Sequence, residues 1–166
     1  MQSSSRLCSW VNRASRAASG SADFSAKIWD ALAGDELRCF VHKHIVRACA
    51  FSESTSLLLT GGHDKILRIF DLNRPDAPPK EVDNSPGSIR TVAWLHSDQT
   101  ILSSNSDAGG VRLWDLRTQN IARVLDTKSP VTSAEVSQDR RYITTAASDG
   151  WSTQTFPDFV AFRWSD

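Results

Sequence analysis

Short runs of alternating apolar and polar residues recur along this chain, and turns rich in Gly, Asp, Asn and Ser separate them. Runs of about four to seven residues with many β-branched and aromatic side chains predict β-strands. The clearest runs cover residues 46–51, 57–60, 65–71, 89–94 and 131–136. The pattern therefore predicts an all-β protein built from many short strands.

An aromatic residue followed by Asp ends one strand of each repeating unit. The pairs are Trp29-Asp30, Phe70-Asp71 and Trp114-Asp115. Their period of about 40–45 residues is typical of the blades of a β-propeller. A four-stranded sheet cannot bury both of its faces alone, and stacking copies side by side covers the faces between them.

A second aspartate lies in a turn ahead of each of these strands. The turn residues are Asp23, Asp64, Asp107 and Asp149, and short strand-like runs precede them at 17–19, 57–60, 101–104 and 142–145. A short polar side chain can accept hydrogen bonds from nearby backbone N–H groups and so hold a tight reversal. These aspartates are therefore expected to be structural.

The period divides the chain into units. We expect a degenerate first strand region at 1–16, a partial blade at 17–43, blades at 44–84 and 85–128, the start of a further blade at 129–150 and a divergent tail at 151–166. Propellers close with about four to eight blades. The sequence therefore predicts an incomplete propeller with about three to four blades.

Composition narrows the possible partners and compartments. The 166 residues are 40% hydrophobic, and 19 basic residues balance 19 acidic ones. Such a balance favours neither nucleic acid nor an anionic membrane as a direct partner. No apolar run reaches the length of about 18 residues that a membrane span needs. Three cysteines, an odd number, argue against a disulfide framework and for a reducing compartment.

The first 22 residues are rich in Ser and Arg and contain no acidic residue, a composition shared with organelle transit peptides. A degenerate first blade is the better interpretation, because the repeat period places Trp10 at the position of Phe51 and Trp94. The residues around Trp10 nevertheless lack the expected alternation.

The sequence contains only incomplete motifs for metal binding or catalysis. Cys39, His42, His44 and Cys49 could be drawn as a metal site, but their spacing matches no usual zinc motif. His63-Asp64 and the many serines suggest a hydrolase triad, yet no Gly-x-Ser-x-Gly elbow is present. Phosphate-binding and dinucleotide-binding motifs are also missing from the sequence. We therefore expect no catalytic residue, no metal and no cofactor.

Arg68, Arg90 and Arg112 lie on predicted strands. They could anchor a partner, although a solvated charge on a strand face is the commoner situation.

The segments SADFSAKIWD, LLTGGHDKILRIFDLNRPDAPPKE and VRLWD resemble the WD-repeat β-propeller family, over residues 17–150. The resemblance implies a parent with about seven blades, a number within the usual range for propellers. This chain would then correspond to the second to the fourth or fifth blade, and the full-length parent would be needed to close the ring. An open arc exposes sheet faces and strand edges, so we expect the isolated chain to be marginally stable.

The resemblance implies a non-catalytic scaffold that binds other proteins of a multiprotein complex. The implied roles are assembly of spliceosomal ribonucleoproteins with the survival-of-motor-neuron complex and signalling by kinase receptors, in the cytoplasm and the nucleus. A scaffold like the i subunit of translation initiation factor 3 is the alternative. A propeller with a ligand or catalytic site in its central channel is a third possibility.

The family also implies a hydrogen-bond network of His, Asp, Ser or Thr, and Trp within a blade. The second unit offers His42, Asp64 and Thr60, but Phe70 replaces the Trp and has no N–H group to donate. The other units offer Ser19, Asp23 and Trp29 without a His, and Ser103, Asp107 and Trp114 with Ser85 at the His position. No unit is expected to complete the network, while Trp29 and Trp114 are expected to pack between sheets.

Overall fold

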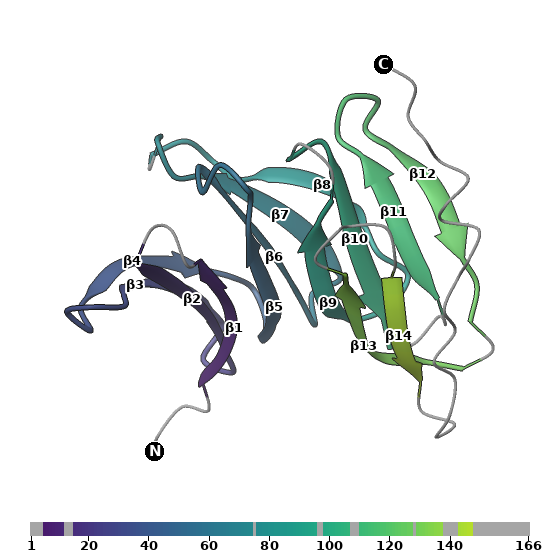
Figure 1. Ribbon diagram of the computed structural model, residues 1–166, viewed down its shortest axis with the longest axis horizontal. Coiled ribbons are helices and arrows are strands. Elements are labelled where there is room, and N and C mark those ends of the chain that lie inside the picture. The colour runs from purple at the N-terminus through teal and green to yellow at the C-terminus, as the bar shows by residue number, and fades with distance from the viewer. Residues whose placement is uncertain are drawn as a thin grey trace.

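The computed structural model describes residues 5–11, 15–74, 76–95, 98–106, 110–127, 129–137 and 143–147. These residues form fourteen strands, arranged as three four-stranded antiparallel sheets and one two-stranded sheet. The sheets follow one another in chain order and fan out into an arc (Figure 1). The all-β architecture predicted from the sequence is confirmed. In the part of the chain just given, no helix is long and apolar enough to cross a membrane.

The first sheet contains β1 (Ser5–Val11), β2 (Arg16–Ser21), β3 (Ser25–Asp30) and β4 (Glu36–Val41), each paired with the next. β1 comes from the predicted degenerate first strand region at 1–16, and its pairing with β2 completes a four-stranded sheet. Trp10 pairs with Ala17, the register that the repeat period predicts.

The second and third sheets repeat this meander. They contain β5 (Val46–Phe51), β6 (Leu57–Gly62), β7 (Ile66–Asp71) and β8 (Lys80–Asn84), then β9 (Ile89–Trp94), β10 (Thr100–Asn105), β11 (Val111–Asp115) and β12 (Asn120–Leu125). Each strand covers the run predicted for it to within a few residues. The last sheet has β13 (Val131–Val136) and β14 (Ile143–Ala147). The predicted tail at 151–166 lies outside the described residues.

Apolar side chains are buried between sheets rather than within one sheet. The first and second sheets enclose Ala18, Ile28, Cys49, Phe51, Leu58, Phe70 and Leu72. The second and third enclose Ala48, Leu59, Leu67, Ile69, Ile89, Val92, Trp94, Ile101 and Trp114. The third and the last enclose Leu95, Leu102, Val111, Leu113, Leu125, Val131, Ala134 and Ile143. Since a buried Leu or Ile contributes about 1.5–3 kcal/mol, each sheet depends on its neighbours for stability.

The repeated aromatic residue has different surroundings in each unit. Trp114 is 1% exposed between the second and third sheets, and Phe70 is buried between the first and second. Trp29 lies on the face of the first sheet opposite Ile28 and is only half-buried, because no described sheet packs on that face. The expectation that Trp29 packs between sheets is therefore wrong for the part of the chain that the structure describes.

Gly61 lets the second and third sheets approach closely. A Cβ atom at this position would lie 2.6 Å from Cγ2 of Ile89 on β9. Real Cβ atoms do not come so near to a branched side chain without a shift of the backbone.

We expect Gly61→Ala to lower the free energy of unfolding by about 1–3 kcal/mol, because it overpacks this contact. Ile89→Ala alone should also destabilise the protein, by about 2–5 kcal/mol. The double variant should lose less stability than the sum of the two single losses. Ile89→Ala removes the Cγ2 methyl that the new Cβ atom of Gly61→Ala would otherwise meet. Urea unfolding of the four proteins measures this coupling, and additive losses would contradict the packing described here.

Candidate functional site

The aspartate that follows each aromatic residue accepts backbone hydrogen bonds from the next turn. Asp30 Oδ1 accepts from the N–H groups of Leu32 at 2.8 Å and Ala33 at 3.1 Å, Asp71 Oδ1 from Asn73 at 2.9 Å, and Asp115 Oδ1 from Arg117 at 2.8 Å. These backbone bonds hold the pKa of the Asp30 and Asp115 carboxyls below the ordinary value, while for Asp71 the first cause is the hydrogen bond from Arg74. All three carboxylates therefore shape the turn into the fourth strand.

In the first unit, the other repeated aspartate accepts hydrogen bonds within its own turn. Asp23 Oδ1 accepts the hydroxyl of Ser25 at 2.6 Å and its N–H at 3.0 Å, and the hydroxyl bond is the main reason why the pKa of Asp23 is lowered. Asp64 binds the guanidinium of Arg68, whose side chain is 6% exposed. Asp107 and Asp149 lie outside the described residues.

The network of the second unit stops where Phe70 replaces Trp. His42 Nδ1 lies 3.1 Å from the carbonyl oxygen of Phe40, which can only accept, so Nδ1 carries the proton. His42 Nε2 then accepts from the Thr60 hydroxyl at 2.9 Å. Burial is the main cause that lowers the pKa of His42, and it favours this neutral form. The Phe70 ring packs beside His42, with centroids 5.6 Å apart, and contributes no hydrogen bond.

The other two units keep the indole bond. Trp29 Nε1 donates to Ser19 Oγ at 2.8 Å, and Trp114 Nε1 donates to Ser103 Oγ at 2.9 Å. At the His position of the third unit, the Ser85 hydroxyl donates to Asn105 Oδ1 at 2.6 Å. Asn105 was not among the residues predicted from the sequence, although a buried polar residue at the end of a strand needs a hydrogen-bond partner.

The structure does not assemble the metal site that the sequence suggested. Cys39 is exposed on β4 and Cys49 is buried on β5, while both ring nitrogens of His42 are engaged by Phe40 and Thr60. Within the residues that the structure describes, no group of three or more His, Cys, Asp and Glu could hold a metal ion.

A serine–histidine pair does form near the second unit. Ser88 Oγ lies 2.7 Å from His63 Nδ1, but Ser88 is 3% exposed and so presents no accessible nucleophile. The neighbouring Asp64 is bound to Arg68 instead of the imidazole. This arrangement supports the turn between β6 and β7 and lacks the geometry of a hydrolase triad.

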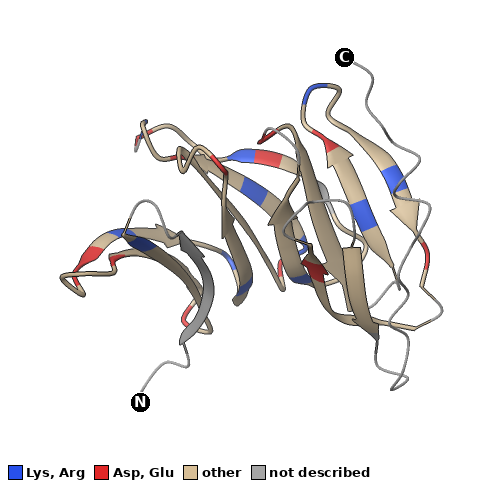
Figure 2. Cartoon of the chain, viewed as in Figure 1, with Lys and Arg blue, Asp and Glu red and all other residues tan. Residues whose placement is uncertain are grey.

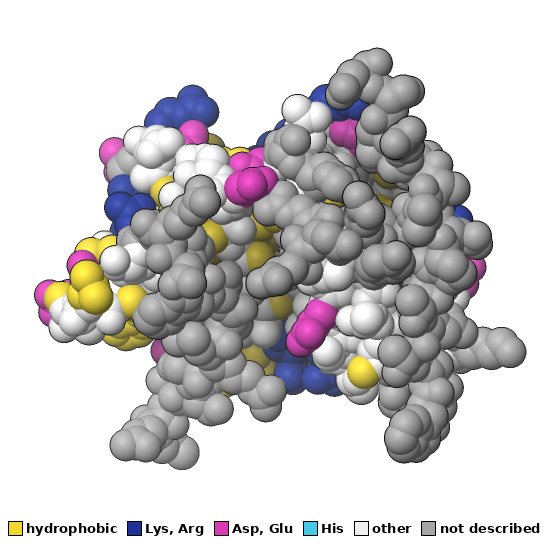
Figure 3. Space-filling view, in the orientation of Figure 1, with side chains coloured by type: hydrophobic (Ala, Val, Ile, Leu, Met, Phe, Trp, Pro, Cys, Tyr) yellow, Lys and Arg dark blue, Asp and Glu magenta, His cyan; other side chains and the backbone are white. Residues whose placement is uncertain are grey.

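A cleft of about 490 Å³ opens between β5, β9 and β13. Its lining combines apolar groups such as Phe51 and Trp94 with the carboxylates of Glu53 and Glu135. Figure 3 shows a hollow in this part of the surface with acidic side chains beside it. The Trp94 indole donates to the Ala50 carbonyl at 3.0 Å, so it also links β9 to β5.

The stacked four-stranded antiparallel sheets and their repeated turn aspartates are the features of a β-propeller built from sequence repeats. Residues 34–71 and 79–115 match the family described as WD domain, G-beta repeat, so the chain is a WD-repeat protein. It is 45% identical to the serine-threonine kinase receptor-associated protein of Homo sapiens over 122 residues, which cover 74% of this chain and 34% of that protein. The protein of the same name from Dictyostelium discoideum is 41% identical over 154 residues, with 89% of this chain and 52% of the relative covered.

A more distant relative is pre-mRNA-processing factor 19 of Oryza sativa subsp. japonica. It is 26% identical over 148 residues, which cover 84% of this chain and 28% of the relative. The chain thus spans roughly a third to a half of the length of the receptor-associated relatives that it matches.

The two indole bonds offer a matched test. We expect Ser103→Ala to lower the free energy of unfolding by about 1–3 kcal/mol, because it leaves the buried N–H of Trp114 without an acceptor. Ser19→Ala should lower it by less than about 1 kcal/mol, because water can replace the acceptor at the half-buried Trp29. Urea unfolding of both variants measures the difference, and an equal loss would show that burial does not decide the strength of this bond.

The buried imidazole makes stability depend on pH. The pKa of His42 is lowered by folding, so below about pH 6.5 the unfolded chain takes up a proton that the folded chain does not bind. The stabilisation that the neutral His42 ring contributes is complete above that pH. It declines as the pH falls toward the pKa that His42 has in the folded protein. His42→Gln should therefore lose less stability than the unchanged protein between pH 7.5 and pH 5.5, as measured by urea midpoints. The same decline in both proteins would contradict this assignment.

Proposed function

We propose that this chain acts as a non-catalytic scaffold of the receptor-associated type and binds other proteins of a multiprotein complex. The observation that carries the proposal is the 45% identity to the receptor-associated protein over 74% of the chain. The hydrogen bonding agrees with it, because the repeated polar residues hold turns and neighbouring strands together. Binding would then depend on the exposed loops at the ends of the sheets.

The finer proposal concerns the partners. The name of the relatives states an association with a serine-threonine kinase receptor, and we extend this association to the chain. We further propose a role in the assembly of spliceosomal ribonucleoproteins with the survival-of-motor-neuron complex, in the cytoplasm and the nucleus. The likeness to a pre-mRNA-processing factor supports a link to RNA processing.

The chain matches only part of the length of the receptor-associated relatives. Because it spans about a third to a half of the receptor-associated relatives, we propose that full partner binding requires the blades of a closed propeller. Two large apolar side chains are exposed on β4, Leu37 at 45% and Val41 at 83%, and a further sheet would cover them.

A parallel capture experiment tests the scaffold. The tagged chain and the tagged full-length receptor-associated protein are incubated with the same cell extract, with an unrelated WD-repeat protein as control. We expect both to retain proteins of the survival-of-motor-neuron complex or a kinase receptor, with a lower yield for the chain. Retention of translation initiation factor 3 subunits in place of these proteins would contradict the proposal and support the alternative.

A further inference from the structure

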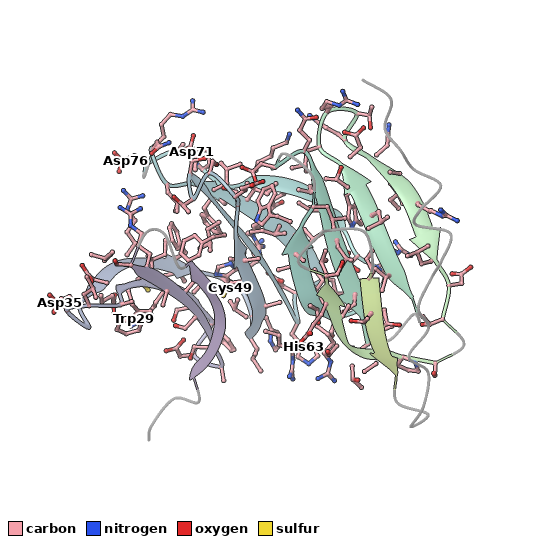
Figure 4. All side chains as sticks on the ribbon, viewed as in Figure 1. Trp29, Asp35, Cys49, His63, Asp71 and Asp76 are labelled. Carbon is pink, nitrogen blue, oxygen red and sulfur yellow. The ribbon has the colours of Figure 1, made fainter. Side chains whose placement is uncertain are left out.

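A group of aromatic and basic side chains lies at one end of the strands of the first three sheets, on three loops and at the starts of β5 and β9. We call it the basic surface. Its residues are Phe24 in the β2–β3 turn, Lys43 and His44 before β5, Arg47 on β5, His63 and Lys65 in the β6–β7 turn, and Arg90 on β9. Figure 4 shows His63 at this end of the second sheet and Asp71 at the opposite end. Figure 2 shows basic residues along the ribbon where β5 and β9 begin, and Figure 3 shows basic side chains on this part of the surface.

Two of these residues have unfavourable backbone conformations. Phe24 has a φ of 70° and Lys65 a φ of 65°, in the left-handed region that glycine adopts freely and other residues avoid. Each directly follows the turn aspartate of its unit, where the fourth unit has Gly150 after Asp149. Bulky side chains kept at a strained position where glycine would fit suggest that the side chains themselves are needed.

The rings at this surface form a continuous row. The centroids of Phe24 and His44 are 5.3 Å apart, and those of His44 and His63 are 5.0 Å apart. The Ile45 N–H donates to His44 Nδ1 at 2.9 Å, so the proton of the neutral ring lies on Nε2, which is a donor. His63 is held by Ser88 at 2.7 Å and by its own N–H, which donates to the Ile45 carbonyl at 3.0 Å. The row is thus fixed in place before any partner binds.

The charge at this surface is positive. Lys43, Lys65 and Arg90 are exposed, and Asp64 is paired with Arg68. Asp23 accepts from Ser25 and keeps its negative charge, so three exposed basic side chains face one exposed carboxylate on these loops. Phe24 is 42% exposed and offers an apolar surface beside these charges. A partner that complements the surface would carry several carboxylates and one apolar or aromatic side chain.

We propose that the basic surface binds an acidic segment of a partner protein, with Phe24 contacting its apolar side chain and Lys65, Arg90 and His44 binding its carboxylates. This inference rests on the proposed scaffold function and adds the chemistry of the partner. An acidic peptide fits better than RNA, because the chain as a whole has a net charge of +0 and a domain that binds nucleic acid is usually strongly basic. The short row of rings and charges also matches a peptide of modest length.

The test uses the full 166-residue chain and three labelled probes of about twelve units. They are a peptide of Glu and Asp with one central Phe, the same peptide with Lys in place of the acids, and a uridine oligonucleotide. Fluorescence anisotropy should show binding of the acidic peptide, weakened several-fold between low and physiological salt because the charges are exposed. The Lys peptide should not bind, and the oligonucleotide should bind more weakly than the acidic peptide.

The variants exploit the strained turns. Phe24→Gly and Lys65→Gly should keep or raise the urea midpoint, because glycine suits their φ values. Each should weaken binding of the acidic peptide by about three- to tenfold, the loss expected when one anchoring side chain is removed. The matched control is Gln119→Gly, which makes the same change at a φ of 57° in the β11–β12 turn and should leave binding unchanged. Arg90→Gln tests the charge at a position without strain and should weaken binding about threefold.

Equal affinity of the four variants and the unchanged chain would overturn the inference, as would failure of the acidic peptide to bind or tighter binding of the oligonucleotide. The capture experiment separates this failure from that of the scaffold. If Phe24→Gly and Lys65→Gly retain the partners of the receptor-associated protein in full, the partners bind elsewhere and only this inference is wrong. If the unchanged chain captures none of those partners, the proposed function is wrong.

Discussion

The burial of one sheet face against the next is the interaction on which the rest of this structure depends. Each of the three apolar clusters draws its residues from two consecutive sheets. Among the residues that the structure describes, no sheet has a core of its own, so its strands remain ordered only while a neighbour covers them. The period of the sequence follows directly from this constraint, because each unit must supply two apolar faces that match those of the units beside it.

The polar network tolerates variation because the apolar contacts between sheets are retained. In the second unit, Phe70 replaces the indole, and the ring packs on Phe40 with centroids 4.4 Å apart. Arg68, 5% exposed, pairs with Asp64 and Glu81 on the same sheet. The third unit replaces the imidazole with the bond from Ser85 to Asn105. The buried polar groups named here therefore find different partners in each unit.

The sequence predicted the strands, the turn aspartates and the incomplete network because these follow from local patterns with a fixed period. The repeat period also predicted the register of β1, although the residues around Trp10 lack alternation. Two features could not be predicted. Asp98 accepts the N–H groups of Glu53 at 2.7 Å and Ser54 at 3.1 Å, a contact between the β5–β6 and β9–β10 loops of consecutive sheets. The row of rings beginning at Phe24 likewise forms only when three loops meet.

Hydrogen exchange resolved by strand tests the dependence on neighbouring sheets most directly. The second and third sheets are covered on both faces, so the amides of β6, β7, β10 and β11 should exchange most slowly. The amides of β3, β4, β13 and β14 should exchange much faster, because the described sheets cover only one face of the first and last sheets. Equal protection of all the sheets would contradict the account, since it would mean that each sheet is stable without its neighbours.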